Sequence, residues 1–277
     1  MPESEPEAQK AANRALWDKW TKVHLEGDFY HVDSFKAGDS RLRDYEIEEV
    51  GGVAGKDLLH LQCHFGLDTL SWARLGARVT GADYSEAAVA EARKLAVEVG
   101  LEARFVCSDV YDLSGVLEGD FDIVYTSRGV LGWLPDIEGW ADVVAHFVRP
   151  GGLFYITEVH PFAQVFDDDE SITELRVKYP YFSQAEALTF PVQGSYADRG
   201  ARVEHDFEYG WNHSLGEIVT ALASRGLRIE FLHEFPFLEW PSPYYVPIGD
   251  ERYVLPDSQE GETPSFFSLK ATKPLAY

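Results

Sequence analysis

Apolar and polar residues along the chain follow two alternating periods. Short apolar runs of strand length alternate with longer runs whose apolar residues recur at helical spacing. The pattern predicts strands over 57–62, 78–83, 103–108, 121–127, 153–159, 227–233 and 265–272, and helices over 11–26, 67–75, 86–99, 136–148 and 214–225. This alternation is typical of an α/β fold with a doubly wound, mostly parallel sheet and helices on both faces.

The regular rhythm is interrupted between residues 161 and 212. Two stretches there, 187–193 and 201–209, are expected to pair as strands, and long connections in α/β folds are usually functional. We therefore interpret 161–212 as a cap or substrate-binding insertion, 1–50 as an N-terminal helical lid that is frayed before Ala11, and 51–160 with 213–277 as the core. The last two predicted strands are expected to pair antiparallel and to close one edge of the sheet.

The segment 57–85 carries the strongest chemical signal. A strand ends, the chain turns at residues 62–66, and a helix begins; Gly66 permits the backbone conformation that such a turn requires. Asp83 stands at the end of the next strand. An acid at this place accepts hydrogen bonds from both ribose hydroxyls of a nucleoside bound in the crevice at the carboxyl ends of the strands.

A second acid, Asp109, ends the third predicted strand, where the adenine edge would lie if the ribose sits on Asp83. Ser108 and Val110 beside it offer backbone groups, and Tyr84 is placed to pack on the adenine face. Taken singly, each acid is equally well explained as a loop or N-cap carboxylate. Two acids that end successive strands after a glycine turn favour a nucleoside site.

Residues 59–66, LHLQCHFG, fall on the D-L-G-C-G-x-G-like motif of the class I S-adenosylmethionine-dependent methyltransferases. With GADYS, FVCSDV, FDIVYTSRGVLGWLPD and RPGGLFYITEVHP, the chain resembles that family over about 50–273. The string HLQCHFGLDTLSWARLGA resembles a bacterial small-molecule subgroup. The resemblance implies a seven-stranded Rossmann-like sheet of order 3-2-1-4-5-7-6 with strand 7 antiparallel. It also implies S-adenosylmethionine as cofactor and S-adenosylhomocysteine as product.

The motif departs from the family pattern at three positions. His60 occupies the place of the usual acid, and Gln62 and His64 replace the first two glycines. Side chains there crowd a ligand unless the loop keeps negative φ values throughout, so we expect a reshaped pocket. Two interpretations stay open: Gln62 or His64 contacts the methionine end of the cofactor, or both merely satisfy neighbouring backbone groups.

Further site candidates follow from the resemblance. The segment that contains Ser127 and Arg128 passes under the methionine of the cofactor; Arg128 either faces the cofactor or pairs with a surface carboxylate. His160 and His213 are candidate general bases, and the alternative for each is a cap or a core hydrogen bond. The candidate pocket walls, all of which are also common core residue types, are Trp17, Tyr30, Phe35, Trp133 and Trp211.

The net charge of the chain disfavours some classes of binding partner. The 277 residues include 47 Asp and Glu against 24 Lys and Arg, which gives a formal net charge of −23. Such a surface repels phosphate backbones and anionic lipid headgroups, so neither nucleic acid nor membrane is an expected partner. Solubility or salt adaptation explains the charge most simply, and attraction of a sulfonium cofactor is the second explanation.

The N-terminal residues lack the order of a secretory signal, and no apolar run is long enough to span a bilayer, so a cytoplasmic protein is expected. The two cysteines, Cys63 and Cys107, form no CxxC pattern and are expected to be reduced and buried at strand ends. No metal site is expected.

These features predict a methyltransferase that moves a methyl group by direct displacement to an oxygen or nitrogen of a small molecule, with secondary metabolites among the candidates. Most of the catalysis is expected from holding the two reactants in line. Two other classes stay open. A nicotinamide-dependent oxidoreductase shares the strand, glycine turn and acid but would carry the GxGxxG spacing, which is absent. A non-catalytic S-adenosylmethionine-binding protein is the other. The oligomeric state is open, with a homodimer as one option.

Overall fold

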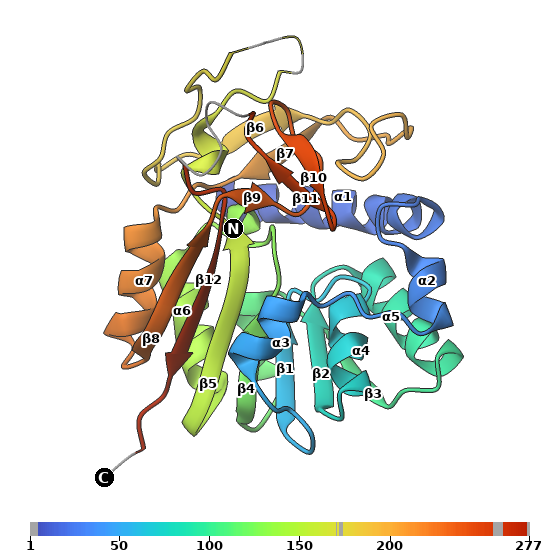
Figure 1. Ribbon diagram of the computed structural model, residues 1–277, viewed down its shortest axis with the longest axis vertical. Coiled ribbons are helices and arrows are strands. Elements are labelled where there is room, and N and C mark those ends of the chain that lie inside the picture. The colour runs from blue at the N-terminus through green and yellow to red at the C-terminus, as the bar shows by residue number, and fades with distance from the viewer. Residues whose placement is uncertain (1–4, 170, 172–173, 257–262, 276–277) are drawn as a thin grey trace.

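Seven strands form the central sheet of the computed structural model, which describes residues 5–169, 171, 174–256 and 263–275 (Figure 1). The strand order is β3-β2-β1-β4-β5-β12-β8, and β12 runs antiparallel to both of its neighbours while the other pairs are parallel. The strands are β1 (Asp57–Leu61), β2 (Arg78–Asp83), β3 (Ala103–Cys107), β4 (Phe121–Thr126), β5 (Val148–Val159), β8 (Arg228–Phe235) and β12 (Phe266–Thr272). The order and direction confirm the predicted fold class.

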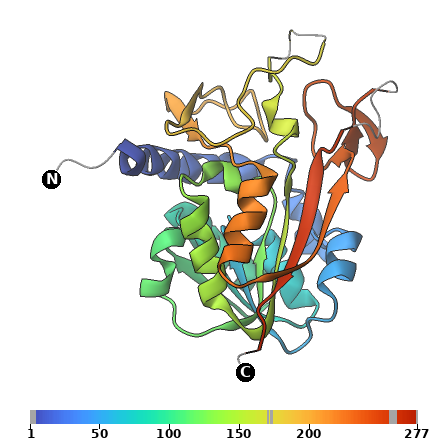
Figure 2. The same ribbon diagram turned by 90° about the vertical axis from the view of Figure 1, so that its left-hand side faces the viewer.

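Side chains of the central strands are buried on both faces of the sheet. Leu59 and Leu61 of β1 pack in one cluster with α6 (Ile137–Phe147) and α7 (Leu215–Ser224). Leu58 packs in another with residues of α3 (Asp44–Val50) and α4 (Leu67–Arg74). Successive side chains of a strand point to opposite faces, so helices on both sides require near-continuous apolar strands. Figures 1 and 2 show α6 and α7 side by side on one face.

Two helix boundaries confirm local sequence signals. Ser85 accepts a hydrogen bond from the Ala88 N–H at 3.1 Å and begins α5 (Glu86–Glu98), as predicted. Gly226, at φ 80°, follows the end of α7. Glycine adopts this left-handed conformation without the steric cost that other residues incur.

The N-terminal region differs from expectation. Helix α1 (Glu5–Glu26) begins at Glu5, so the expected fraying up to Ala11 is wrong for the described residues. Glu5 and Glu7 in the first turn interact favourably with the positive end of the helix dipole, which stabilises this start of the helix. The short helices α2 (Val32–Ala37) and α3 were not predicted, because six or seven residues show too little of a helical period.

Two small sheets lie with α1 above the carboxyl ends of the core strands (Figure 1). In the cap, β6 (Leu188–Pro191) pairs antiparallel with β7 (Phe207–Gly210), as expected, although β7 is shorter than the predicted 201–209. The second sheet, β9 (Phe237–Leu238), β10 (Val246–Gly249) and β11 (Arg252–Val254), was not predicted. We call residues 237–254 the second insertion; their strands are too short to show a period of two.

The two cysteines have different environments. Cys63 is buried, and burial raises the pKa of its thiol, whereas Cys107 is exposed. The expectation that both are buried is therefore wrong for Cys107. It ends β3, which is an edge strand of the sheet and exposes Arg104 as well. None of the described helices combines the length and the apolar character that a bilayer crossing requires.

Candidate active site

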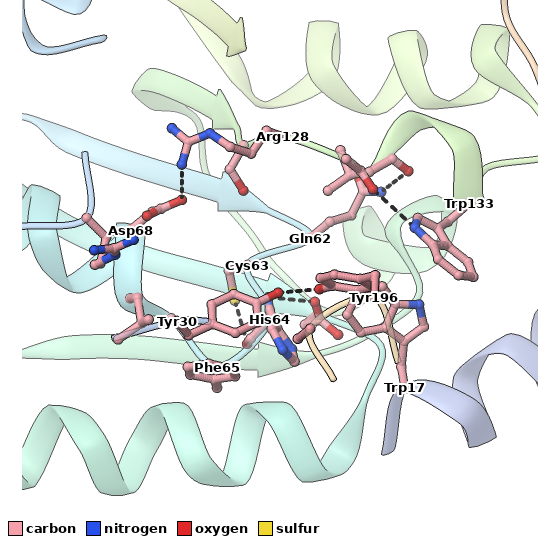
Figure 3. Close-up of a pocket in the computed structure, with 18 of the residues that line it drawn as sticks. Trp17, Tyr30, Gln62, Cys63, His64, Phe65, Asp68, Arg128, Trp133 and Tyr196 are labelled. Carbon is pink, nitrogen blue, oxygen red and sulfur yellow. Dashed lines mark hydrogen bonds and ion pairs between the residues drawn. The ribbon is translucent and has the colours of Figure 1, made fainter. Parts of the chain in front are cut away.

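A cavity of about 800 Å³ lies at the carboxyl ends of the first four core strands (Figure 3). The core contributes residues 61–68, 82–84, 108–111 and 127–130 to its lining. Trp17 of α1, residues 196–198 of the cap and residues 239–241 of the second insertion line it as well. The cavity therefore lies at the crevice predicted from the strand ends, and three segments outside the core cover it.

The loop after β1 keeps a glycine-like backbone without the glycines. Gln62 has φ 58°, His64 has φ 50° and Gly66 has φ 82°, so the loop does not keep the negative φ values that were the condition for leaving a ligand uncrowded. Backbone hydrogen bonds fix the turn, because Cys63 N donates to Ala82 O and Gly66 N donates to Cys63 O, both at 2.9 Å. A left-handed conformation costs a non-glycine residue about 1–2 kcal/mol, and two residues bear that cost here.

Asp83 is held at the cavity by the backbone around it. Its Oδ2 accepts a hydrogen bond from His64 N at 2.8 Å, and its Oδ1 accepts one from Ser85 N at 2.9 Å. Burial raises the pKa of Asp83 to about 6, and the two N–H groups oppose that shift. The carboxylate is therefore oriented, dehydrated and close to its titration range near neutral pH.

Asp109 lies at the same end of the sheet and is tied to α1. Its Oδ2 accepts a hydrogen bond from Lys10 Nζ at 3.0 Å, and its Oδ1 accepts one from Tyr111 N at 3.0 Å. Tyr84, Ser108 and Val110 line the cavity beside these groups. The two acids from adjacent strands thus face one cavity.

His60, in the place of the usual family acid, is an internal hydrogen-bonding residue. Its Nδ1 is 2.8 Å from Thr69 Oγ1, and its Nε2 is 2.9 Å from Ser127 Oγ. Burial lowers the pKa of His60 to about 3, so the ring is neutral. Ser127 lines the cavity, and His60 fixes the direction of its hydroxyl group.

Arg128 lines the cavity and pairs with buried acids rather than with a surface carboxylate. Its guanidinium group contacts Glu46, lies 2.8 Å from Glu239 Oε2 and 3.8 Å from Asp68 Oδ2. Glu239 belongs to the second insertion, which the guanidinium therefore joins to α3 and α4. A buried charge needs such partners, since an unpaired one is strongly destabilising.

Four predicted site residues lie outside the cavity lining. His160 pairs with Glu234 at 2.9 Å, and His213 lies 2.7 Å from the carbonyl oxygen of Leu134, so both contact other parts of the protein. Phe35 is fully buried in a core cluster, and Trp211 is buried beside the cap. These residue types serve both in cores and in sites, and here the folded structure places them in the core. Trp17, Tyr30 and Trp133 do line the cavity.

Several lining residues were missed by sequence reasoning. Tyr196 of the cap and Glu239 and Glu251 of the second insertion come from segments without any motif. His24 of the predicted helix 11–26 is not a lining residue and was not singled out as a site residue, yet its Nδ1 lies 2.9 Å from His64 Nε2. The only signal in the sequence for this contact is that a histidine replaces a motif glycine.

Comparisons with known proteins agree with this geometry. Residues 59–156 match the family described as a methyltransferase domain. The ubiquinone biosynthesis O-methyltransferase of Cronobacter sakazakii is 36% identical over 147 residues, which are 52% of this chain and 57% of that protein. The chain thus spans a little over half the length of that curated relative.

Solved structures show the same fold. A putative S-adenosylmethionine dependent methyltransferase from Listeria monocytogenes has a TM-score of 0.58 at 17% identity and covers 83% of this chain and 96% of its own. The [4+2]-cyclase SpnF has a TM-score of 0.53 at 20% identity, covering 84% and 80%. The chain has the class I methyltransferase fold, and its residues 59–156 belong to the methyltransferase domain family.

Proposed function

We propose that this protein transfers a methyl group from S-adenosylmethionine to a hydroxyl oxygen of a small, flat molecule. One observation carries the proposal: Asp83 and Asp109 end adjacent strands and face the same cavity within the matched domain. In folds of this kind a carboxylate after β2 accepts hydrogen bonds from the ribose hydroxyls, and the adenine edge lies beside the segment after β3.

The lining residues fit a cofactor of this kind. Gln62 Oε1 and Tyr84 Oη are shielded from solvent and have no hydrogen-bond partner among the described residues. A nucleoside with hydroxyl groups and a methionine ammonium supplies donors for such atoms, and buried polar atoms are rarely left unpaired. Carboxylates also outnumber Lys and Arg side chains in the lining, which favours a cationic sulfonium.

The cofactor supplies an electrophilic methyl group when bound. The residues of this chain then have three tasks. Asp83 and Asp109 hold the nucleoside, the backbone of residues 62–66 lies against the methionine half, and α1 with the cap excludes water from the reacting centre. Holding two reactants in line contributes about 7–11 kcal/mol in well-oriented systems, so positioning supplies most of the expected rate enhancement.

Aromatic side chains support a flat, uncharged acceptor. The rings of Trp17 and Trp133 lie 5.2 Å apart, and Tyr30 and Tyr196 meet through their hydroxyl groups in the same lining. Such rings stack on flat molecules, while the excess of carboxylates disfavours an anionic one. The name of the Cronobacter sakazakii relative, an O-methyltransferase, supports oxygen as the receiving atom.

The first test is calorimetric titration with S-adenosylmethionine and S-adenosylhomocysteine. We expect micromolar binding to the wild type, loss of binding in Asp83→Ala, and unchanged binding in the matched control Asp57→Ala. Asp57 stands at the opposite end of the sheet, where it pairs with Arg78. Circular dichroism and thermal melts would show that both variants fold. Binding of neither ligand to the wild type would refute the proposal.

The second test is an acceptor screen that follows release of S-adenosylhomocysteine with catechols, phenols, carboxylates and amines. Turnover with a hydroxyl acceptor is the expected result. Turnover only with amines would correct the receiving atom to nitrogen. Cofactor binding without turnover on any class would favour a non-catalytic binder, and binding of NADH in place of S-adenosylmethionine would favour an oxidoreductase.

A further inference from the structure

Three polar side chains from three separate segments form a hydrogen-bonded chain that ends at the cavity wall. His64 Nε2 of the loop after β1 lies 2.9 Å from His24 Nδ1 of α1, and His24 Nε2 lies 2.6 Å from Ser195 Oγ of the cap. We propose that His64 is the catalytic residue that accepts the proton from the acceptor hydroxyl, with His24 and Ser195 as positioning residues. This inference rests on the proposed function.

The free nitrogen of His64 is placed for this task. Its Nδ1 has no hydrogen-bond partner among the described residues, although the ring lines the cavity. Figure 3 shows the His64 ring between Tyr30 and Trp17, with ring centroids 5.5 Å and 5.1 Å away. A buried imidazole nitrogen without a partner is costly, so a ligand hydroxyl that donates to it would be favoured.

Several other bases of the lining already have partners. Asp83 and Asp109 accept hydrogen bonds at the nucleoside end. Glu239 pairs with Arg128 at 2.8 Å, and His31 lies 2.9 Å from Glu251. Among the described lining residues, His64 therefore combines an unpaired proton-accepting nitrogen with a place in the aromatic part of the cavity.

The hydrogen-bonded chain can fix the tautomer that this role requires. If His64 Nδ1 carries the lone pair, its Nε2–H donates to His24 Nδ1, and the His24 Nε2–H donates to Ser195 Oγ. Ser195 is buried, and its Oγ also accepts from Ala197 N at 3.1 Å, which holds it in place. A hydrogen-bond partner on the other ring nitrogen commonly selects the tautomer and the orientation of a catalytic histidine.

The proton balance of the step is simple. The acceptor oxygen forms a bond to the methyl carbon, the carbon–sulfur bond breaks with its electron pair moving to sulfur, and the hydroxyl proton moves to His64 Nδ1. The resulting imidazolium keeps its Nε2–H bond to His24 Nδ1. No other reactant is needed.

The surroundings keep the His64 ring neutral before the reaction. Burial lowers the pKa of His64 well below its usual value, and His24 acts in the same direction. The titratable groups that contact the two histidines are Tyr30 and Tyr196, through their rings, and Asp83 and Cys63, through the His64 backbone. The hydroxyl groups of Tyr30 and Tyr196 hydrogen-bond to each other in the same lining.

Nitrogen-15 NMR of histidine-labelled full-length protein tests the tautomer without any acceptor. Signals are assigned with His64→Gly and His24→Asn. We expect His64 in the Nε2–H form at pH 7, and a mixture of both tautomers in Ser195→Ala. An Nδ1–H or a protonated His64 in the wild type would overturn the inference. Because this measurement needs neither cofactor nor acceptor, its failure is distinct from a failure to bind S-adenosylmethionine.

Kinetics of His64→Gly test the proton transfer with the acceptor found in the screen. Glycine suits the φ of 50° at this position, so we expect folding and cofactor affinity to be retained while kcat falls about 10²-fold or more. The rate of the variant should rise with pH as the acceptor ionises, and added imidazole should restore part of it. The exposed control His146→Asn should behave as wild type. An unchanged kcat, or a loss that neither pH nor imidazole restores, would overturn the role.

Discussion

Lys10 Nζ lies 3.0 Å from Asp109 Oδ2, so the N-terminal helix is bonded to the acid that follows β3. The same helix meets the core again where Asp18 accepts a hydrogen bond from Ser85 Oγ at 2.6 Å. Helix α1 therefore lines the cavity and is hydrogen-bonded to the segments that follow β2 and β3.

Asp18→Ala should loosen this link. Asp18 Oδ1 also accepts from Ala87 N at 3.2 Å in the first turn of α5, so it adds to the Ser85 cap. We expect a loss of about 1 kcal/mol in the free energy of unfolding, measured by urea denaturation, and faster cofactor dissociation by stopped flow. Lys22→Ala is the control, because Lys22 on the same helix is exposed. Equal effects of the two substitutions would contradict the prediction.

Cofactor affinity should depend on pH through Asp83. Burial raises the pKa of this carboxyl to about 6, so its ionised form, which accepts the ribose hydroxyls, is lost as the pH falls through that value. We expect a constant Kd above about pH 7 and a rise approaching tenfold per pH unit below about pH 6. Calorimetry at stepwise pH measures it. A Kd that stays flat down to about pH 5 would show that Asp83 is not the titrating group.

Gly66→Ala should destabilise the protein through a steric clash as well as backbone strain. A Cβ at Gly66, which has φ 82°, would lie 2.8 Å from the ring of Phe105. Gly100 has a similar φ of 68°, but a Cβ there has nothing within 4 Å. We expect urea denaturation to show a loss of about 1 kcal/mol for Gly100→Ala and about 2–4 kcal/mol for Gly66→Ala. Equal losses would mean that Phe105 moves aside freely.

Arg128→Met should be strongly destabilising. The substitution leaves the buried carboxyl groups of Glu46 and Glu239 without their cation, and breaking a buried pair on one side costs about 3–5 kcal/mol. Arg225→Met is the matched control, since its partners Glu138 and Asp142 are mostly exposed and its loss should stay below about 1 kcal/mol. Thermal and urea unfolding measure both. A small effect at Arg128 would show that the acids become protonated at little cost.

Sequence patterns predicted the core well because its rules are local. Strand β2 (Arg78–Asp83) has the predicted bounds, since its four central residues are all buried, as is typical of a parallel strand covered on both faces. Ser85 predicted the start of α5 because an N-cap is a hydrogen bond between residues three apart. Asp83 and Gly66 were found for the same reason: both are fixed by their positions at the end of a strand.

The sequence alone did not decide which histidines face the cavity. His160 and His213 follow plausible elements, yet their partners Glu234 and Leu134 are distant in sequence. His24 and His64 are 40 positions apart, and their 2.9 Å contact exists only because α1 crosses the loop after β1.

The amino-acid sequence by itself determined the fold class, the strand order through its family resemblance, and the two acids that line the cavity at the strand ends. The tertiary structure decided what closes the cavity: Glu239 follows β9 and Glu251 lies in the turn between β10 and β11, strands that are too short to show a period, and Tyr196 comes from an irregular loop. The physical reason is the separation along the chain between the residues that interact. Helices, strands and caps are set by neighbours along the chain, whereas a cavity is set by contacts between segments that only the packed sheet brings together.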